Sequence, residues 1–260
     1  DIRTVADYRP QVATLVLDNP AKRNAFDPAM RVEMADVVRQ VQGDPSIRAL
    51  VLTGAGAHFC SGGDLANIAA SGLDNGGWRQ RLTSLHDWLK DLMLLDKPVV
   101  AAVDGAAYGA GFSLALAADF IVASTRARFA MSFIRMGVVP DCAAFYTLPR
   151  VVGVQRAREL MLSGREVSAQ EALRLGIATE LVEPDALQAR AQAIARSFVG
   201  ASPVALSLIK RSLSLAANDL PSLLEQEANA QALAMGTPEH LEAVHCFLEK
   251  KPLPFQWPQA

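Results

Sequence analysis

Glycines in the middle of the chain follow an apolar run and could form a receptor for a negatively charged oxygen. Residues 98–103 have the length and the β-branched composition of a buried strand. Gly105, Gly109 and Gly111 then turn the chain into residues 112–118, where good helix formers occupy the interior. The first N–H groups of a helix have no intrahelical acceptor, so such a turn can direct them at an anion or an oxyanion.

A second stretch, residues 52–65, has the same character, because an apolar strand passes into small residues that let another backbone or a ligand come close. Two such turns can direct two N–H donors at one oxygen, the usual means of stabilising a thioester enolate or a tetrahedral oxyanion. The chain has neither a G-x-x-x-x-G-K-[ST] motif nor a G-x-S-x-G elbow, and Gly109-Ala-Gly111 lacks the third glycine of a dinucleotide fingerprint. We therefore expect a receptor for a substrate oxygen; glycines that only allow close packing are the alternative.

The elements that must position these turns follow a strand, helix, strand order. Residues 12–17 and 48–53 are expected to be buried strands. Between them, Asp27 and Pro28 are typical of a helix N-cap and first turn. A crossover of this kind is nearly always right-handed and makes the two strands parallel, so the sequence predicts an α/β fold. The apolar residues at helical spacing in this segment are Met30, Met34, Val37, Val38 and Val41.

The rest of the chain divides into more strand and helix and then into helix alone. Ser168 and Glu171 form a capping box for one helix. We expect a core domain over residues 1–200 and a helical C-terminal region over residues 201–260, which is too small for a core of its own and must pack on its own core or on a neighbouring subunit. The further expected elements are strands at 120–123 and 178–182, an extended segment at 126–133, helices at 151–163, 168–175 and 185–199, and three helices opened by Pro203, Pro221 and Pro238.

The composition excludes several classes of protein. The chain has 260 residues, 51% hydrophobic and 20% charged, and its formal charge of −2 gives no reason to expect nucleic acid or an anionic membrane as a partner. No segment resembles a signal peptide, and the most apolar stretch, residues 99–118, is interrupted by Asp104 and glycines, so no membrane span is expected. Cys60, Cys142 and Cys246 lack metal-ligand spacing, which predicts no metal site and indicates buried thiols in a reducing cytoplasm.

Short motifs are spread over nearly the whole chain. They are 19–25 (NPAKRNA), 58–64 (HFCSGGD), 97–105 (KPVVAAVDG), 109–111 (GAG), 162–164 (LSG), 168–172 (SAQEA) and 247–250 (FLEK). Together they resemble the crotonase, or enoyl-CoA hydratase/isomerase, superfamily. The resemblance implies a spiral of repeated ββα turns with a helical C-terminal region, and a homotrimer or a hexamer made of two trimers. It also implies an acyl-CoA thioester as substrate, with no separate cofactor because CoA is part of that substrate.

Catalytic positions follow from this resemblance. The oxyanion donors would be the backbone N–H groups of Gly63 and Ala110; the family usually has glycine at the second position, and alanine keeps the N–H. Enoyl-CoA hydratases use two glutamates at positions that here hold Ser113 and Phe133. Neither residue can act as a carboxylate acid or base, so ordinary hydration by that pair is not expected.

Asp141 is the carboxylate that remains at a family catalytic position. Its context after Pro140 resembles the Δ3,Δ2-enoyl-CoA isomerases and the ring-1,2-epoxyphenylacetyl-CoA isomerases. Moving a double bond needs one base that removes a proton beside the thioester and returns it two carbons away, and one aspartate is enough. The simpler alternative is that Asp141 only caps the helix that follows.

Other activities fit the same positions. Asp141 also matches the nucleophile of the 4-chlorobenzoyl-CoA dehalogenases and His86 their water-activating histidine, although Phe133 stands where those enzymes have tryptophan; a solvated helix histidine is the alternative for His86. Enoyl-CoA hydration is another alternative. The last alternative is that the protein is a non-catalytic scaffold or RNA-binding relative. Asp141 argues against a site without catalytic residues, and the absence of a basic stripe argues against RNA binding.

The resemblance also assigns the residues that bind CoA. They are the backbone of Lys22, Arg23 and Ala25, then Ser61 and Asp64 near the adenine, and Phe247 with Lys250 from a neighbouring subunit. Phe247 and Lys250 are three apart, which predicts one face of a helix. The alternative for Lys250 and Lys251 is a basic last helical turn that interacts favourably with the helix dipole. Residues 66–78 are glycine-rich and are expected to form a mobile loop that shapes the acyl pocket.

Overall fold

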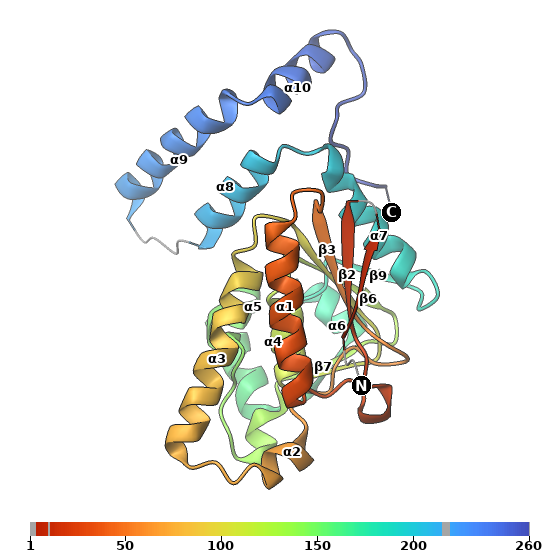
Figure 1. Cartoon of the computed structure of the whole chain (residues 1–260), viewed down its shortest axis with the longest axis vertical. Coiled ribbons are helices and arrows are strands. Elements are labelled where there is room, and N and C mark those ends of the chain that lie inside the picture. The colour runs from red at the N-terminus through yellow and green to blue at the C-terminus, as the bar shows by residue number, and fades with distance from the viewer. Residues whose placement is uncertain (1–3, 10, 215–218, 260) are drawn as a thin grey trace.

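The computed structural model describes residues 4–9, 11–214 and 219–259 and contains two sheets (Figure 1). The larger sheet has the order β1-β2-β3-β4-β6-β9, and the smaller one has the order β5-β7-β8. The strands are β1 (Thr4–Arg9), β2 (Val12–Leu17), β3 (Ala49–Gly54), β4 (Val99–Val103), β5 (Ala106–Tyr108), β6 (Phe120–Ser124), β7 (Arg128–Ala130), β8 (Glu166–Ser168) and β9 (Glu180–Val182).

Helices alternate with these strands, and after β9 the described chain continues with helices. The predicted caps are confirmed: the Asp27 side chain accepts from the Met30 N–H at 2.9 Å, and Ser168 from the Glu171 N–H at 3.3 Å. The helices are η1 (Pro20–Lys22), α1 (Pro28–Gly43), α2 (Leu65–Ala70), α3 (Asn75–Met93), α4 (Ala110–Leu116), η2 (Ser132–Met136), α5 (Ala144–Ser163), α6 (Ala169–Arg174), α7 (Leu187–Ser197), η3 (Phe198–Gly200), α8 (Pro203–Ser214), α9 (Leu220–Met235) and α10 (Pro238–Leu248).

The α/β prediction is confirmed by the pairing of the strands. β2, β3, β4, β6 and β9 pair in parallel, as a succession of crossovers requires. After β4 the chain enters β5 of the second sheet before it reaches α4, and after β6 it enters β7 in the same way. Repeated ββα turns therefore build the spiral that the resemblance implied.

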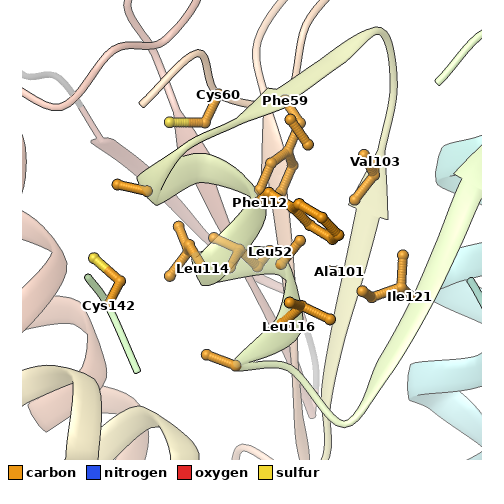
Figure 2. Close-up of a cluster of buried hydrophobic side chains, with 14 of the residues drawn as sticks. Leu52, Phe59, Cys60, Ala101, Val103, Phe112, Leu114, Leu116, Ile121 and Cys142 are labelled. Carbon is orange, nitrogen blue, oxygen red and sulfur yellow. The ribbon is translucent and has the colours of Figure 1, made fainter. Parts of the chain in front are cut away.

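The centre of the molecule is the short helix α4, all of whose residues are buried. Figure 2 shows Phe112 of this helix among Phe59, Ala101, Val103 and Ile121, side chains from the surrounding strands and turns. The ring centroid of Phe112 lies 5.2 Å from that of Phe129 on β7. Ala110, Gly111, Ser113 and Ala115 are small, whereas Leu114 and Leu116 add to the apolar core around the helix, so its first residue has little freedom to move.

The C-terminal helices extend away from this body, and the chain then returns to it (Figure 1). Helix α8 is tied to the core by ion pairs between Lys210 and Asp119 and between Arg211 and Asp96, at 2.6 and 2.9 Å. In the described chain, no residue of α9 is buried and none of α10 is buried. After α10, residues 251–259 lie against α7 and β6. The aromatic rings that pack there are Phe120, Phe198, Phe255 and Trp257.

The loop prediction for residues 66–78 is wrong, because most of that segment is helix. Asp64 caps α2 by accepting from the Ala66 N–H at 3.1 Å, and Asp74 caps α3 by accepting from the Gly77 N–H at 2.8 Å. These aspartates initiate helices on both sides of a short connection that contains Gly72, and Gly76 and Gly77 fall in the first turn of α3, where their flexibility costs little.

Other element boundaries in the structure differ by several residues from those predicted from the sequence. The extended segment at 126–133 is only partly strand, since it ends in η2, and the helix expected from residue 151 begins at residue 144. Within α5, Gly153 has φ 76° and breaks the helix into two parts, which explains why only the second part showed a helical pattern. Among the described residues no single helix has the length and hydropathy of a membrane span; α7 with η3 and α8 reach it only when joined across a bend of 113°.

Candidate active site

The two glycine turns lie side by side because their strands pair. Cys60 and Ala107 form a parallel bridge, and the Tyr108 N–H donates to the Cys60 carbonyl at 2.9 Å. Gly63 and Ala110 each follow one member of this pair by three residues. Parallel pairing in this register brings Gly63 and Ala110 to the same end of the two turns. The structure thus brings together two predicted donors that are far apart in the sequence.

Close contact between the turns explains two of the glycines. Gly62 has φ +99°, and a Cβ there would lie 2.9 Å from the Tyr108 carbonyl oxygen and 3.5 Å from the Ala110 nitrogen. A Cβ on Gly111 would lie 2.2 Å from the Cys60 carbonyl oxygen. No side chain fits at such distances, so glycine is required at both positions for the backbones to meet.

The N–H groups of Gly63 and Ala110 have no acceptor within the described chain. Ala110 is the first residue of α4, preceded by Gly109 at φ 53°, and its side chain is buried. On either side of Gly63, by contrast, the backbone is fixed: the Phe26 N–H donates to Gly62 and the Asp64 N–H donates to Phe26, at 2.7 and 3.0 Å. Two unused donors held by fixed neighbours can stabilise one oxyanion at low reorganisation cost.

Asn24 organises the first turn, and the sequence analysis gave it no role of its own. Its side-chain amide donates to the carbonyls of Ala55 and His58 at 2.9 and 2.7 Å, and its Oδ1 accepts from the Asn19 N–H at 2.9 Å. The residue is fully buried and left-handed, with φ 57°. An asparagine inside the turn 19–25 was the available signal, because asparagine tolerates this conformation and can bond to nearby backbone.

Asp141 lies between η2 and α5 and does not cap the helix that follows. The N-cap residue of α5 is Ala143, and no side chain caps this helix within the described residues. Asp141 Oδ1 is buried without a hydrogen-bond partner there. The next two residues, Cys142 and Ala143, have φ values of 50° and 62°, left-handed conformations that are costly for side chains other than glycine or asparagine. A strained backbone beside a buried carboxylate oxygen that has no hydrogen-bond partner indicates a functional position.

Burial dominates the electrostatics of this carboxylate. It raises the pKa of Asp141 above the usual range of an aspartate, while hydrogen bonding with the Cys142 thiol and the nearby charges of His86 and Arg31 act against the rise. Burial also raises the pKa of the Cys142 thiol, so the thiol keeps its proton and can donate to Asp141. Figure 2 places Cys142 beside Leu114 of α4, with Cys60 near the start of the same helix. Asp141 therefore belongs to the neighbourhood of the two turns.

The two positions where hydratases carry glutamate are closed to solvent. Ser113 is fully buried, and its hydroxyl donates to the Gly109 carbonyl at 3.3 Å. Phe133 is 8% exposed and belongs to the apolar core. Neither position supplies a group that titrates.

The residues assigned to CoA near the first turn form an ion pair and a hydrogen bond with one another. Lys22 Nζ pairs with Asp64 at 2.6 Å, and the Ser61 hydroxyl donates to the Lys22 carbonyl at 3.1 Å. Asp64 is 5% exposed and its pKa is lowered, chiefly by the hydrogen bond from Lys22. Its carboxylate is thus committed to Lys22 and to the cap of α2, so a contact with CoA would come from Lys22 and from the backbone around Arg23 and Ala25.

The predicted shared helix face of Phe247 and Lys250 is wrong. Helix α10 ends at Leu248, and Lys250 has left-handed backbone with φ 57°. Pro252 follows shortly and cannot continue a helix, which is the physical reason for the end. Phe247 is exposed at 72%, on the extended part of the molecule.

A family model described as enoyl-CoA hydratase/isomerase matches residues 8–259. The chain therefore belongs to the enoyl-CoA hydratase/isomerase family, within the crotonase superfamily. It is an enzyme of that family, whose members act on acyl-CoA thioesters.

Particular relatives carry different names. A 1,2-epoxyphenylacetyl-CoA isomerase of Escherichia coli strain K12 is 38% identical over 245 residues, which cover 92% of this chain and 93% of the relative. A probable enoyl-CoA hydratase of Rhodobacter capsulatus is 37% identical, with 93% of both chains covered. The crystal structure of an enoyl-CoA hydratase/isomerase from Cupriavidus metallidurans CH34 superposes with a TM-score of 0.93 at 41% identity, over 99% of this chain and 98% of that one.

Proposed function

We propose that this enzyme moves a carbon–carbon double bond in an enoyl-CoA thioester, with Asp141 as the proton carrier. The observation that carries the proposal is the buried Asp141 carboxylate, whose Oδ1 has no partner among the described residues while Ser113 and Phe133 replace both hydratase glutamates. One relative is named a 1,2-epoxyphenylacetyl-CoA isomerase, which supports isomerisation of an acyl-CoA ester as the class of reaction.

The geometry suits a single-base mechanism. The thioester oxygen accepts hydrogen bonds from the Gly63 and Ala110 N–H groups, which stabilise the negative charge that develops when a proton leaves C2. The Asp141 carboxylate takes that proton from a 3-enoyl thioester, whose double bond joins C3 and C4, and returns it at C4. In the product the double bond joins C2 and C3. The carboxyl is ionised again at the end, and CoA remains attached throughout as part of the substrate.

Replacing Asp141 tests this assignment. Asp141→Asn keeps the size of the side chain but removes the base, so turnover of a trans-3-enoyl-CoA should fall by roughly 10²-fold or more while binding of the ester changes little. Conjugation of the product changes the ultraviolet absorbance of the thioester, which follows the reaction directly. Near-parental turnover of the Asn variant would rule out Asp141 as the proton carrier.

Hydration is a second activity to measure, because one relative is named a probable enoyl-CoA hydratase. Adding water needs both a base and an acid across the double bond, and one aspartate serves both ends poorly. We expect turnover of crotonyl-CoA well below that of the best isomerisation substrate. Comparable rates would make hydration the main activity.

Dehalogenation is the third, favoured by one feature: His86 is close enough to Asp141 to interact with it electrostatically. Asp141 would attack the ring carbon that bears chlorine and expel chloride, and His86 would activate the water that releases the product. Release of chloride from 4-chlorobenzoyl-CoA, lost in both Asp141→Asn and His86→Gln, would support this reaction over isomerisation.

We also propose that the exposed apolar residues of α9 and α10 are covered by other copies of this chain in a homotrimer or a hexamer of two trimers. Phe247 and Lys250 of one subunit would then lie near the nucleotide of CoA bound to the next. Two helices in which no described residue is buried need such cover to stay ordered, which supports the proposal.

A further inference from the structure

The two turns that carry the Gly63 and Ala110 donors are joined by a short ladder of backbone hydrogen bonds. Gly63 and Ala110 follow this ladder within a few residues, so the ladder sets the position of one donor relative to the other. Its bonds run from the Phe59 N–H to the Asp104 carbonyl at 2.8 Å, from the Cys60 N–H to the Ala106 carbonyl at 3.0 Å, and from the Tyr108 N–H to the Cys60 carbonyl at 2.9 Å.

The ladder departs from regular parallel pairing at His58. Because Cys60 exchanges hydrogen bonds with Ala106 and Tyr108, regular pairing would let the Ala106 N–H donate to the carbonyl of residue 58. That carbonyl is turned away and accepts from the Asn24 side-chain amide at 2.7 Å. The Ala106 N–H donates instead to Nδ1 of the His58 ring, at 3.1 Å. An imidazole nitrogen thus takes the place of a ladder carbonyl.

Glycines on both sides make room for His58 in this arrangement. Gly105 has φ +52°, and a Cβ there would lie 2.6 Å from His58 Nδ1 and would overlap the Ala57 carbonyl oxygen. A Cβ on Gly54 would overlap the His58 carbonyl oxygen and lie 2.7 Å from the Asn24 amide nitrogen. The imidazole therefore lies directly against the backbone of the second turn, and the carbonyl of the same residue lies against that of the first.

His58 can accept this hydrogen bond in only one form. Nδ1 must keep its lone pair, so the ring is neutral and carries its proton on Nε2. Ala106 is 5% exposed, so its N–H has little access to water and depends on the imidazole for an acceptor. The side chain of His58 is thereby a direct link from the first turn to the second.

Ala106 begins the segment that ends in the second donor. Strand β5 starts at Ala106, and Gly109, with φ 53°, leads from it into Ala110 at the start of α4. The other edge of β5 is held by β7, where the Gly109 N–H donates to the Ala130 carbonyl at 2.8 Å. That bond holds the second turn on β7 and does not join it to the first turn. Without the His58 bond, the two donors should therefore lose part of their alignment.

We propose that His58 is a positioning residue for the oxyanion receptor: its Nδ1 holds Ala106 and thereby keeps the Ala110 N–H aligned with the Gly63 N–H. The role needs no contact between His58 and the thioester. This inference rests on the proposed function in one respect, that these two N–H groups hold the thioester oxygen. It applies equally to isomerisation and to hydration, because both begin by polarising the thioester.

The test compares two variants of nearly equal size. His58→Asn keeps an acceptor at the place of Nδ1, since its Oδ1 is also bonded to Cγ, whereas His58→Leu has a methyl group there. The ligand is hexanoyl-CoA with an isotope label at the thioester carbonyl, because this saturated ester cannot isomerise. Isotope-edited infrared spectroscopy measures the stretching frequency of the bound carbonyl, which falls when its oxygen accepts hydrogen bonds.

The parent should show a lower carbonyl frequency for the bound ester than for the ester in water. His58→Leu should lose about half or more of this shift and lower kcat by about tenfold or more on the substrate that the parent turns over fastest. The dissociation constant of hexanoyl-CoA should change less than about threefold, because misaligned donors affect the transition state more than the ground state. His58→Asn should keep most of the shift and of kcat. A merely structural role would lower the free energy of unfolding and leave the shift of the folded protein unchanged.

The outcomes separate this inference from the proposed function. An unshifted carbonyl in the parent overturns the oxyanion assignment of the proposed function and this inference with it. A shift that survives in His58→Leu, or that both variants lose equally, overturns the inference alone. A shift lost in His58→Leu and kept in His58→Asn supports the inference even if no 3-enoyl ester is isomerised.

A second measurement decides the case in which His58→Leu does not fold. Nuclear magnetic resonance of the histidine ring nitrogens reports which of them carries the proton, and the signals of His58 are those that His58→Asn lacks. An unprotonated Nδ1 in the parent supports the inference. A protonated Nδ1 overturns it, because such a nitrogen cannot accept from Ala106.

Discussion

Helices α4 and α9 represent two regions that differ in how they are enclosed. Every residue of α4 is buried, although the helix is only 7 residues long, whereas none of the 16 residues of α9 is buried. The apolar side chains of α4, such as Phe112, pack among strands. Helix α9 has apolar side chains such as Leu220 and Leu233, exposed at 66% and 62%. The oxyanion turns are thus enclosed within one chain, while the extended helices depend on whatever covers them.

The difference divides the candidate site into two halves. The half that would activate the thioester is made of backbone groups fixed by pairing between Cys60 and Ala107. The half assigned to the nucleotide includes Phe247 and Lys250, which lie on and after α10, away from that centre. Substitutions should therefore act on folding and chemistry in the first region and on assembly and CoA affinity in the second.

The largest expected effect comes from a methyl group at the centre. Gly111→Ala places Cβ against the Cys60 carbonyl, so the free energy of unfolding should fall by about 3 kcal/mol or more. Gly236→Ala is the matched control at the end of α9, because its Cβ would meet nothing closer than 3.7 Å. Urea unfolding measures both, and equal stabilities would mean that the centre is less tightly packed than described.

Next in size is the loss of apolar surface on the extended helices. Leu241→Ser combined with Phe247→Ser replaces side chains exposed at 63% and 72%, so the proposed trimer should dissociate while the far-ultraviolet circular dichroism stays unchanged. Sedimentation velocity measures the mass. Glu242→Gln, on the same helix, should leave the assembly intact. A double variant that keeps the parental mass contradicts assembly through this face.

Enclosure of Asp141 should appear in the pH dependence of activity. The base must be ionised, and burial raises its pKa, so kcat/KM should fall with decreasing pH at a point above 3.8, the ordinary aspartate value. Arg31→Gln removes a positive charge that favours the ionised form, which should move this acid limb to still higher pH. Arg79→Gln, at an exposed arginine of α3, should not move it. An acid limb at or below 3.8 in the parent would show that Asp141 is not the titrating base.

The smallest expected effect is at the end of the extended region. Lys250→Ala should weaken CoA esters about two- to five-fold and leave pantetheine esters unaffected, since an exposed lysine contributes little to one phosphate contact. Lys251, which pairs with Glu249 at 2.5 Å, offers the control substitution Lys251→Ala. Competition binding measures both. Equal loss for the two kinds of ester would mean that Lys250 does not touch the nucleotide.

Features that depend on neighbours in sequence were predictable. The caps at Asp27 and Ser168, the helix starts at the three prolines and the parallel order of strands all follow from local chemistry or from chain connectivity, and the structure confirms them. The family was recognisable from short motifs. Donor positions at Gly63 and Ala110 came from that resemblance, since no local pattern states that two turns will pair.

Features that depend on distant contacts were missed. Asn24 acts through carbonyls some thirty residues away, and the His58 ring reaches Ala106 only because the two turns pair. Two errors had local signals that were overlooked: Asp74 marks the start of α3 in the supposed loop, and Pro252 marks the end of α10 before Lys250. In the first case the glycine-rich composition was given more weight than the N-cap aspartate. In the second case the spacing of three residues was given more weight than the proline that follows.

Pairing of Cys60 with Ala107 also bears on how such a protein can change over generations. Donors made of backbone survive the replacement of their own side chains, as alanine at position 110 illustrates, provided that the glycines around them are kept. Side chains at positions 113, 133 and 141, by contrast, can be exchanged without dismantling the part that polarises the thioester. One scaffold can thereby acquire a new reaction through a few point mutations, because the common first step is inherited in the main chain and only the proton chemistry has to be reinvented.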